Sequence, residues 1–226
     1  MNQASKIVVI GSGGHAAVVA STLITSGYKV VAFYDDDSQK WGSSILGIPI
    51  TGPVHKVLSA NDFSHGIVAI GQNEQRKKLV QKLDLNWISV IHPFSWVHPE
   101  VEIGVGTIVC AGAIVQPGAT IGSHVIINTK ASVDHHCTVG DFSHIATSHL
   151  AGGASIEEGV FMALSSTVLP GINVEAWATI GAGAVVNKDI PSGVTVVGSP
   201  ARKVKTKMVE TNPNKQNSHY SGSLNN

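Results

Sequence analysis

The sequence contains little of what several fold classes need. Only two of its 226 residues are cysteines, Cys110 and Cys137, which argues against a disulfide-stabilised scaffold and favours a reducing compartment. Charged residues make up 13% with a formal net charge of zero, so a broad basic surface for nucleic acid is not expected. The sequence shows neither a membrane-length apolar run nor a signal-peptide cleavage pattern. We therefore expect a soluble, cytoplasmic protein without a nucleic-acid or membrane partner.

Glycine, by contrast, is abundant, and a six-residue repeat fills the middle of the chain. Every sixth residue from Val97 to Ile145 is aliphatic, and after a break that is one residue short the series continues from Leu150 to Val186. The fourth residue after each anchor is usually small, as at Thr107, Ala113, Ala119, Ala131, Cys137, Ser143, Ala154, Ser166, Ala178 and Ala184. This period fits neither an amphipathic helix nor an alternating strand, but it suits one short strand and one turn per repeat. The repeat predicts triangular coils of parallel strands with the aliphatic anchors inside.

The first part of the chain predicts a different unit. Residues 6–10 and 29–34 are short β-branched runs typical of buried parallel strands, and a glycine turn and a helix between them complete a βαβ unit. The N-terminus of that helix offers free N–H groups and a positive dipole end to a phosphate. An Asp at the tip of the second strand can accept hydrogen bonds from a ribose or a base. A strand at 66–70, a helix at 75–83 and a strand near 87–91 are predicted to follow.

Two alternatives for this unit stay open. Gly11, Gly13 and Ala16, with Asp35 about 20 residues further on, also satisfy a loose dinucleotide fingerprint, which allows a nicotinamide cofactor. The glycine turn could also serve tight packing alone. The unit is short, however, and suits a mononucleotide better than a full dinucleotide.

The chain is predicted to divide at two places. The residue before a proline prefers extended geometry, so His92-Pro93 predicts the junction between the two units. Proline and glycine punctuate the segment after Val186 and end the repeat, and residues from about 205 onward are polar and poor in large apolar side chains. We predict a nucleotide-binding α/β domain at 1–92, a β-helix with a C-terminal arm at 93–204, and a disordered tail at 205–226.

The candidates for chemistry are histidines inside the repeat. His135 and His136 are adjacent, His144 and His149 follow, and imidazoles add nothing to the packing of an aliphatic coil. Three interpretations stand: His135 is a general base, the histidines bind zinc with or without Cys137, or they are solvated surface residues. Residues about two repeats apart would meet in a cleft between neighbouring protomers more easily than within one coil. The cysteines occupy ordinary repeat positions, which argues against a covalent intermediate.

Taken in order, GSGGH, FYDDD, AIGQNEQRKK, VDHHC, VGDFSHIA, the hexapeptides and VVGSPARKV resemble the bacterial sugar O/N-acetyltransferases. The likeness covers about residues 6–204 and is strongest to the N-acetyltransferases of nucleotide-linked 4-amino-4,6-dideoxy sugars, with sialic acid O-acetyltransferases as relatives. It implies a Rossmann-like α/β domain followed by a left-handed parallel β-helix, acetyl-CoA as co-substrate and no metal. It also implies a homotrimer with active sites between protomers and a role in bacterial surface glycan synthesis, such as that of lipopolysaccharide.

The resemblance also assigns residues. The nucleotide-sugar would be bound by Gly13, Gly14, His15, Asp35, Asp36, Gly71 and Glu74. The catalytic base would be His135, followed by His136 where the family usually has an acid. Coenzyme A would be bound near His144, Gly152, Leu164 and Ala182. The short repeat at IATSH is a second departure, and we predict that His149 there replaces a small inward residue.

The reaction that this resemblance implies is direct transfer of the acetyl group, with the anchored nucleotide-sugar presenting its amine to His135. Sugar O-acetylation is the alternative within the same chemistry. A zinc enzyme similar to the γ-class carbonic anhydrases and a non-enzymatic nucleotide-binding scaffold are the alternatives outside it. The identity of the nucleotide (UDP, dTDP or GDP) and the stereochemistry of the sugar are left open by the sequence.

Overall fold

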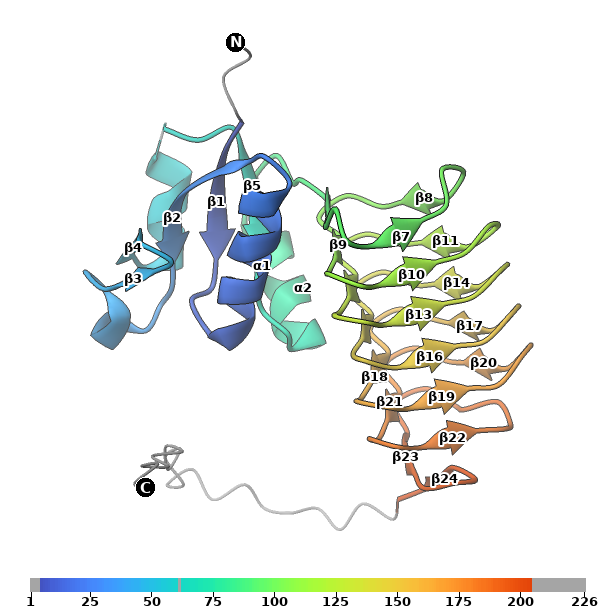
Figure 1. Ribbon diagram of the computed structural model, residues 1–226. Coiled ribbons are helices and arrows are strands. Elements are labelled where there is room, and N and C mark those ends of the chain that lie inside the picture. The colour runs from blue at the N-terminus through green and yellow to red at the C-terminus, as the bar shows by residue number, and fades with distance from the viewer. Residues whose placement is uncertain (1–4, 61, 205–226) are drawn as a thin grey trace, which may run out of the picture.

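A computed structural model of the chain describes residues 5–60 and 62–204. It consists of an N-terminal α/β unit and a parallel β-helix whose coils stack along one axis (Figure 1). This is the predicted fold class, a Rossmann-like domain followed by a left-handed β-helix. The predicted tail at 205–226 lies outside the described residues. No helix in the described part of the chain is long and apolar enough to cross a membrane.

The N-terminal unit is a sheet of order β3-β4-β2-β1-β5, covered on both faces. Its strands are β1 (Lys6–Ile10), β2 (Lys29–Tyr34), β3 (Ser44–Ile45), β4 (Ile48–Gly52) and β5 (His65–Val68). The helices are α1 (Gly14–Thr25), α2 (Asn73–Lys82), and the short 3-10 turns η1 (Ser38–Lys40) and η2 (Val54–Ser59). The central strand β1 is buried on both faces: Ile7 and Val9 pack in one hydrophobic cluster with α1, whereas Val8 and Ile10 pack in another with η2.

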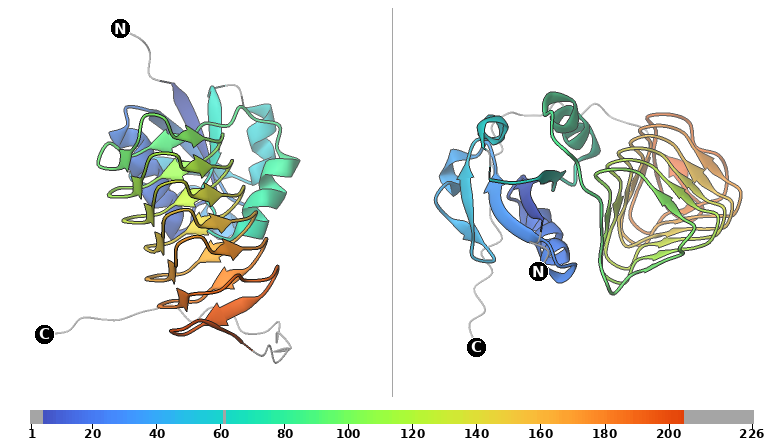
Figure 2. Two further views of the ribbon diagram at one scale, coloured as in Figure 1. Left: turned by 90° about the vertical axis from the view of Figure 1, so that its right-hand side faces the viewer. Right: turned by 90° about the horizontal axis from the view of Figure 1, so that it is seen from above.

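The β-helix has three sheets, one on each side of its triangular coil, and their strands are parallel except for β24, which pairs antiparallel with β23 (Figure 2, right). The sheet that faces the N-terminal unit, here called the domain face, contains β6 (Val90–Ile91), β9 (Ile108–Val109), β12 (Ile126–Ile127), β15 (His144–Ile145), β18 (Phe161–Met162), β21 (Thr179–Ile180), β23 (Thr195–Val197) and β24 (Arg202–Lys203). The second face contains β7 (Trp96–Val97), β10 (Ile114–Val115), β13 (Ser132–Val133), β16 (His149–Leu150), β19 (Thr167–Val168) and β22 (Val185–Val186). The third face contains β8 (Glu102–Ile103), β11 (Thr120–Ile121), β14 (Thr138–Val139), β17 (Ser155–Ile156) and β20 (Asn173–Val174).

The repeat explains this architecture residue by residue. From Val109 to Val186 the aliphatic anchors lie inside the coil, at most 2% exposed, and form one continuous core. Burying each such side chain contributes about 1.5–3 kcal/mol to folding, mostly against the next coil. Most corners contain a residue of positive φ, which is glycine at many of them and the histidines His124 and His136 at two.

The short repeat is accommodated at the corner between β15 and β16. This corner has three residues, 146–148, instead of four, and none of them has a positive φ. Ser148 is buried there and takes the position of the small corner residue. His149 instead begins β16, pairs with Ser132 and Thr167 and is half-buried, so the prediction that it replaces a small inward residue is wrong.

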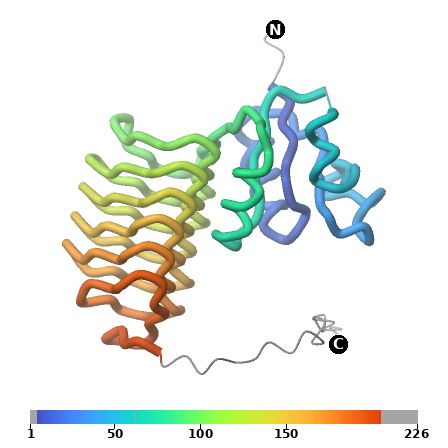
Figure 3. The backbone as a smooth tube through the Cα atoms, turned by 180° about the vertical axis from the view of Figure 1, so that it is seen from behind, coloured from blue at the N-terminus to red at the C-terminus, as the bar shows by residue number. Residues whose placement is uncertain are grey.

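The two units share a hydrophobic core. Ile108 and Ile126 point outward from the domain face, but they are buried in the same cluster as Ile7 and residues of α1. The predicted strand near 87–91 also divides between the units, because Trp87 forms a single bridge to Gly66 whereas β6 pairs with β9 of the β-helix. The domain face is therefore covered near its N-terminal end, and the coils continue beyond the unit that covers it (Figure 3).

Candidate active site

The turn after β1 and the tip of β2 form the first part of the site. Gly11 has φ +99° and its added Cβ would lie 2.9 Å from Ile70, so packing alone requires glycine there. Gly13 and Gly14 have no such requirement: neither has a positive φ in the left-handed region, and a Cβ on either would meet no atom within 4 Å. The backbone is thus open at the N-terminus of α1, where free N–H groups can meet an anion.

The two aspartates after β2 have different environments. Asp35 Oδ2 accepts hydrogen bonds from Ser12 N–H (2.7 Å) and Ser12 Oγ–H (2.6 Å), and Oδ1 accepts from Asp37 N–H (2.9 Å). Partial burial raises the pKa of Asp35, but these hydrogen bonds and Lys40 outweigh it and hold the pKa below its usual value. Asp36 is exposed and accepts from Val54 N–H at Oδ1 only, among the described residues. Asp35 therefore fixes the glycine turn, whereas Asp36 Oδ2 accepts no hydrogen bond from the described residues.

Two pockets lie next to these groups. The first, the turn pocket, has a volume of about 320 Å³ and is lined by Gly11, Asp35, Asp36, Val54, Ile70, Gln75, Lys78 and Leu79. The second, the interdomain pocket, has a volume of about 730 Å³ and lies between the start of α2 and the domain face. It is lined by residues 70–75, Lys78, His144, Gly159, Phe161, Trp177 and Thr179. The predicted residues Gly71 and Glu74 thus line the same pocket as His144.

His144 is neutral in this pocket. Its Nδ1 donates to the carbonyl of Gly71 (3.2 Å), because a carbonyl can only accept, and its Nε2 accepts from Asn128 Nδ2 (3.1 Å). Burial first, and the Arg76 cation second, lower the pKa of His144 to about 4. His15, at the start of α1, has its ring centroid 6.2 Å from that of His144, and the same two causes lower the pKa of His15 to about 4. His15 Nε2 is buried without a hydrogen-bond partner among the described residues.

Arg76 joins the two units beneath these histidines. Its side chain is 1% exposed, and burial lowers the pKa of the guanidinium to about 9, which leaves it charged at neutral pH. Its N–H groups donate to the carbonyls of His124 (2.8 Å), Ile70 (2.9 Å), Gly71 (3.3 Å), Phe142 (2.6 Å) and Ser143 (3.3 Å) and to Asn73 Oδ1 (2.9 Å). The Gly71 carbonyl is therefore shared by Arg76 and His144, and its orientation couples the buried cation to the imidazole.

His135 and His136 occupy a different part of the coil. They lie at the corner between β13 and β14, which is the vertex opposite the domain face. Both are exposed, and their Nδ1 atoms are 3.0 Å apart, so one Nδ1 donates to the other. The His135 ring packs over Gly152, where an added Cβ would lie 2.6 Å from Cε1 and Nε2. His136 has φ +56°, and the planes of the two rings lie at 79° to each other.

The groups predicted to meet coenzyme A do not converge in one chain. Gly152 lies beside His135 at the vertex between the second and third faces. Leu164 and Ala182 are exposed at corners between the domain face and the second face, one coil apart. His144 lies on the domain face itself. The second face therefore separates Gly152 from Leu164 and Ala182.

The histidine, cysteine and acidic side chains bear on the zinc and covalent alternatives. Nowhere in residues 5–60 and 62–204 do three or more His, Cys, Asp or Glu side chains gather in a way that could hold a metal ion. Cys137 points inward and its thiol donates to the Ala151 carbonyl (3.1 Å). Burial raises the pKa of Cys137 and raises that of Cys110 to about 12, so neither thiol is a ready nucleophile.

Several residues of the site were not assigned from the sequence. Arg76, Asn73, Lys77 and Lys78 all lie on α2, within the segment in which only Gly71 and Glu74 had been assigned. The sequence did contain one indication of their role. This helix has few apolar residues, so polar contacts must attach it to the rest of the protein. Lys77 forms an ion pair with Glu158 and lies over the rings of Phe142 and Trp177, and Asn73 Nδ2 donates to the Gly159 carbonyl (3.0 Å).

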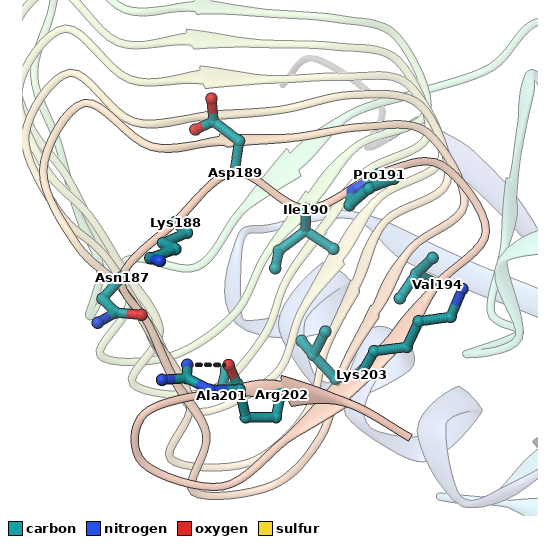
Figure 4. A pocket seen from close by; sticks show the side chains of 10 residues that line it. Asn187, Lys188, Asp189, Ile190, Pro191, Val194, Ala201, Arg202 and Lys203 are labelled. Carbon is teal, nitrogen blue, oxygen red and sulfur yellow. Dashed lines mark hydrogen bonds between the residues drawn. The ribbon is translucent and has the colours of Figure 1, made fainter. Parts of the chain in front are cut away.

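A further pocket of about 360 Å³ lies at the C-terminal end of the β-helix, between the last coil and β24 (Figure 4). Its walls are partly apolar, from Ile190 and Val194, and partly basic, from Lys188, Arg202 and Lys203. The Arg202 guanidinium donates to the carbonyl of Ala201 (2.8 Å). This pocket shares no lining residue with the turn pocket or the interdomain pocket.

A hexapeptide β-helix with histidines at its corners, joined to an α/β unit with an open glycine turn, defines an acyltransferase of the left-handed β-helix class. Residues 6–83 match the family model described as the PglD N-terminal domain. The structure is similar to PerB from Caulobacter crescentus, solved with CoA and GDP-perosamine, at 37% identity and a TM-score of 0.83 over 88% of this chain and 97% of that one.

Two further relatives are also acetyltransferases. The acetyltransferase domain of PglB from Neisseria gonorrhoeae matches at 35% identity and a TM-score of 0.82 over 88% of this chain and 100% of that domain. The GDP-perosamine N-acetyltransferase of Escherichia coli O157:H7 is 31% identical over 66% of this chain and 75% of its own length. Two serine acetyltransferases are also matched, over half of their length or less. The chain belongs to the bacterial sugar N-acetyltransferases, and it is an acetyl-CoA-dependent acyltransferase.

Proposed function

We propose that this enzyme transfers an acetyl group from acetyl-CoA to the 4-amino group of a nucleotide-linked 4-amino-4,6-dideoxy sugar, in the synthesis of bacterial surface glycans. The observation that carries the proposal is the likeness to PerB, a protein solved with CoA and GDP-perosamine, which extends over both units of this chain. Perosamine is itself a 4-amino-4,6-dideoxy sugar. The likeness therefore includes the unit that would hold the nucleotide as well as the β-helix.

The local geometry supports a nucleotide at the N-terminal unit. Gly13 and Gly14 leave open space at the N-terminus of α1, although packing does not require glycine at either position. Such a turn can approach a diphosphate closely. Asp36, with a free carboxylate oxygen on the adjoining pocket wall, is the better of the two aspartates for a ribose or a base, and Asp35 holds the turn in place through Ser12.

His135 is proposed as the general base. Its ring is exposed, and a neutral imidazole can accept the proton that the sugar amine loses as it attacks the thioester carbonyl. When His136 Nδ1 accepts from His135 Nδ1–H, the lone pair of His135 is fixed at Nε2. The protonated His135 then donates a charge-assisted hydrogen bond to a neutral His136, so an imidazole can do the orienting that an acid does elsewhere in the family.

A complete site then requires a second copy of the chain. The pockets of the N-terminal unit open beside the domain face, whereas His135 lies at the opposite vertex of the same coil. A sugar held by one chain would therefore meet His135 of a neighbouring protomer. A homotrimer with three sites between protomers satisfies this requirement, and it also lets Gly152 of one chain approach Leu164 and Ala182 of the next.

The test has two parts. Thiol release from acetyl-CoA is measured with UDP-, dTDP- and GDP-linked 4-amino-6-deoxy sugars, with and without a chelator, and NMR of the product locates the acetyl group. Turnover with one of them, insensitive to the chelator and lost in His135→Ala, supports the proposal. An O-acetylated product, loss of turnover with the chelator, or an unimpaired His135→Ala variant contradicts it.

The shared site is tested by mixing two inactive variants. His135→Ala keeps a wild-type nucleotide unit, and Gly14→Phe, which fills the open turn, keeps a wild-type His135. Neither chain then contains both halves, so co-expression restores activity only if sites form between protomers, to about one quarter of wild type for random mixing in a ring. A co-expressed mixture that remains inactive argues for sites within single chains.

A further inference from the structure

The turn pocket and the interdomain pocket share one wall. Ile70, Gln75 and Lys78 line both pockets, and Gln75 and Lys78 lie three residues apart on α2, on the same side of the helix. A ligand that enters the turn pocket beside Asp36 and continues into the interdomain pocket beside His144 must therefore pass Lys78. The two pockets therefore adjoin along α2, and the route from one to the other, here called the path, runs beside Lys78.

The charges along this path are unevenly distributed. Asp35 and Asp36 line the turn pocket and Glu74 lines the interdomain pocket, whereas His144 is neutral. Among the residues that line the two pockets, Lys78 is the single cation. A ligand with negative charge in its middle and neutral groups at both ends would match this order of charges.

Other nearby cations are already engaged. Arg76 is fully buried and its donors are taken by carbonyl and amide oxygens. Lys77 is paired with Glu158, and Lys40 lies 3.5 Å from carboxylates of Asp35 and Asp37. Lys78 is exposed to solvent. It is the cation on this wall that can reach a ligand.

We propose that Lys78 binds the diphosphate of the nucleotide-sugar in the turn pocket, which Gly11 and Asp36 also line, and so sets the preference for a nucleoside diphosphate over a nucleoside or monophosphate. This rests on the proposed function, because it assumes a nucleotide-linked substrate. Lysine binds phosphate as a point charge from a flexible stem, which suits an exposed wall. Loss of one such contact at a partly solvated site should weaken binding about tenfold, or about 1.4 kcal/mol.

The experiment is calorimetric titration of the full chain with GDP, UDP and dTDP, followed by the monophosphate and the nucleoside of whichever binds. Lys78→Met should weaken diphosphate binding about tenfold and leave the nucleoside unchanged. Lys78→Arg should retain most of the affinity. Lys82→Met, one turn further along α2 and outside both pockets, removes the same charge and is the matched control, expected to bind as wild type.

Three results would overturn the assignment. Lys78→Met could bind the diphosphate as tightly as wild type, it could lose nucleoside affinity to the same extent, or Lys82→Met could show the same loss, which would indicate a general charge effect. A failure of the proposed function looks different. In that case the wild-type protein binds acetyl-CoA but none of the three nucleoside diphosphates, and the proposals for the substrate and for Lys78 fall together.

Discussion

Two neighbouring glycines at the corner below His135 permit a sharp test of the catalytic assignment. An alanine Cβ at position 152 would lie 2.6 Å from Cε1 and Nε2 of His135, and Gly152 itself has no positive φ. At position 153 the reverse holds: φ is +69°, but a Cβ would meet no atom within 4 Å. Gly152→Ala therefore perturbs the histidine, whereas Gly153→Ala strains only the backbone.

The magnitudes follow from these contacts. Ordinary contact with the new methyl group requires the His135 ring to move by about 1 Å, and a displacement of that size at a catalytic group can reduce the rate about 100-fold. The ring is an exposed side chain and can rotate, so the stability of Gly152→Ala should match wild type. Gly153→Ala forces a non-glycine residue into the left-handed region at a cost of about 1–2 kcal/mol, which lowers Tm by about 2–4 °C per kcal/mol in a protein of this size.

Steady-state kinetics and thermal unfolding of both variants separate the two effects. We expect kcat to fall in Gly152→Ala at unchanged Tm, and Tm to fall in Gly153→Ala at unchanged kcat. A rise in KM for acetyl-CoA in Gly152→Ala at unchanged kcat would show that position 152 acts through the coenzyme alone and not through His135. Full activity in Gly152→Ala would refute the reasoning, because His135 would then tolerate displacement.

Three other outcomes are expected. Acidification should destabilise the fold, because burial holds the pKa of His15 and His144 near 4 in the folded protein. Between pH 6.5 and 4 the unfolded chain therefore binds more protons than the folded chain. Each histidine lowers the free energy of unfolding by up to about 3 kcal/mol over this range, and the loss is complete below pH 4. Urea unfolding at pH 7.5 and pH 4.5 measures this loss, and equal stabilities would contradict it. Arg76→Met should destabilise the fold by about 1–3 kcal/mol for each buried carbonyl that is left without a donor, and should raise the pKa of His144, because a neighbouring cation is removed. NMR titration of His144 follows this change, and an unshifted titration curve speaks against the coupling. His136→Ala should lower kcat about five- to tenfold, the worth of one hydrogen bond, and His136→Glu should restore it. Equal rates in all three proteins would show that His136 does not orient the base.

The β-helix could be predicted from the sequence because its determinants are local. Each coil repeats the same aliphatic anchor and small corner residue, and one six-residue period places an anchor such as Val133 inside regardless of distant contacts. The short repeat shows the limit of this reasoning. Counting from Ile145 placed His149 at the inward corner position, but the structure omits one corner residue and keeps the strands in register, so Ser148 turns the corner.

The N-terminal half of the site was harder to predict because its contacts cross between the two units. Strand and helix patterns located β1, α1 and β2, but they assigned Asp35 to the nucleotide and did not predict that it accepts hydrogen bonds from Ser12 in the glycine turn. They gave no reason to select Arg76 from a run of basic residues on α2. Arg76 is buried because it donates to carbonyls at β-helix corners far along the chain, such as that of Phe142. A local sequence pattern cannot predict a contact between residues so far apart in the chain.

The domain face shows how one repeat position acquires different roles along the β-helix. Ile108, Ile126, His144, Phe161 and Thr179 are register partners in successive coils, each the outward residue of its strand. The first two lie under α1 and are buried as core. The last three lie where the covering unit ends, and they line the interdomain pocket instead. The repeat fixes which side chains point outward, but the extent of the N-terminal unit decides which of them pack in the core and which line a pocket. His144 is the first of these outward residues that lies beyond the part of the domain face covered by α1. Its position at this edge explains why it is buried and also lines an open pocket.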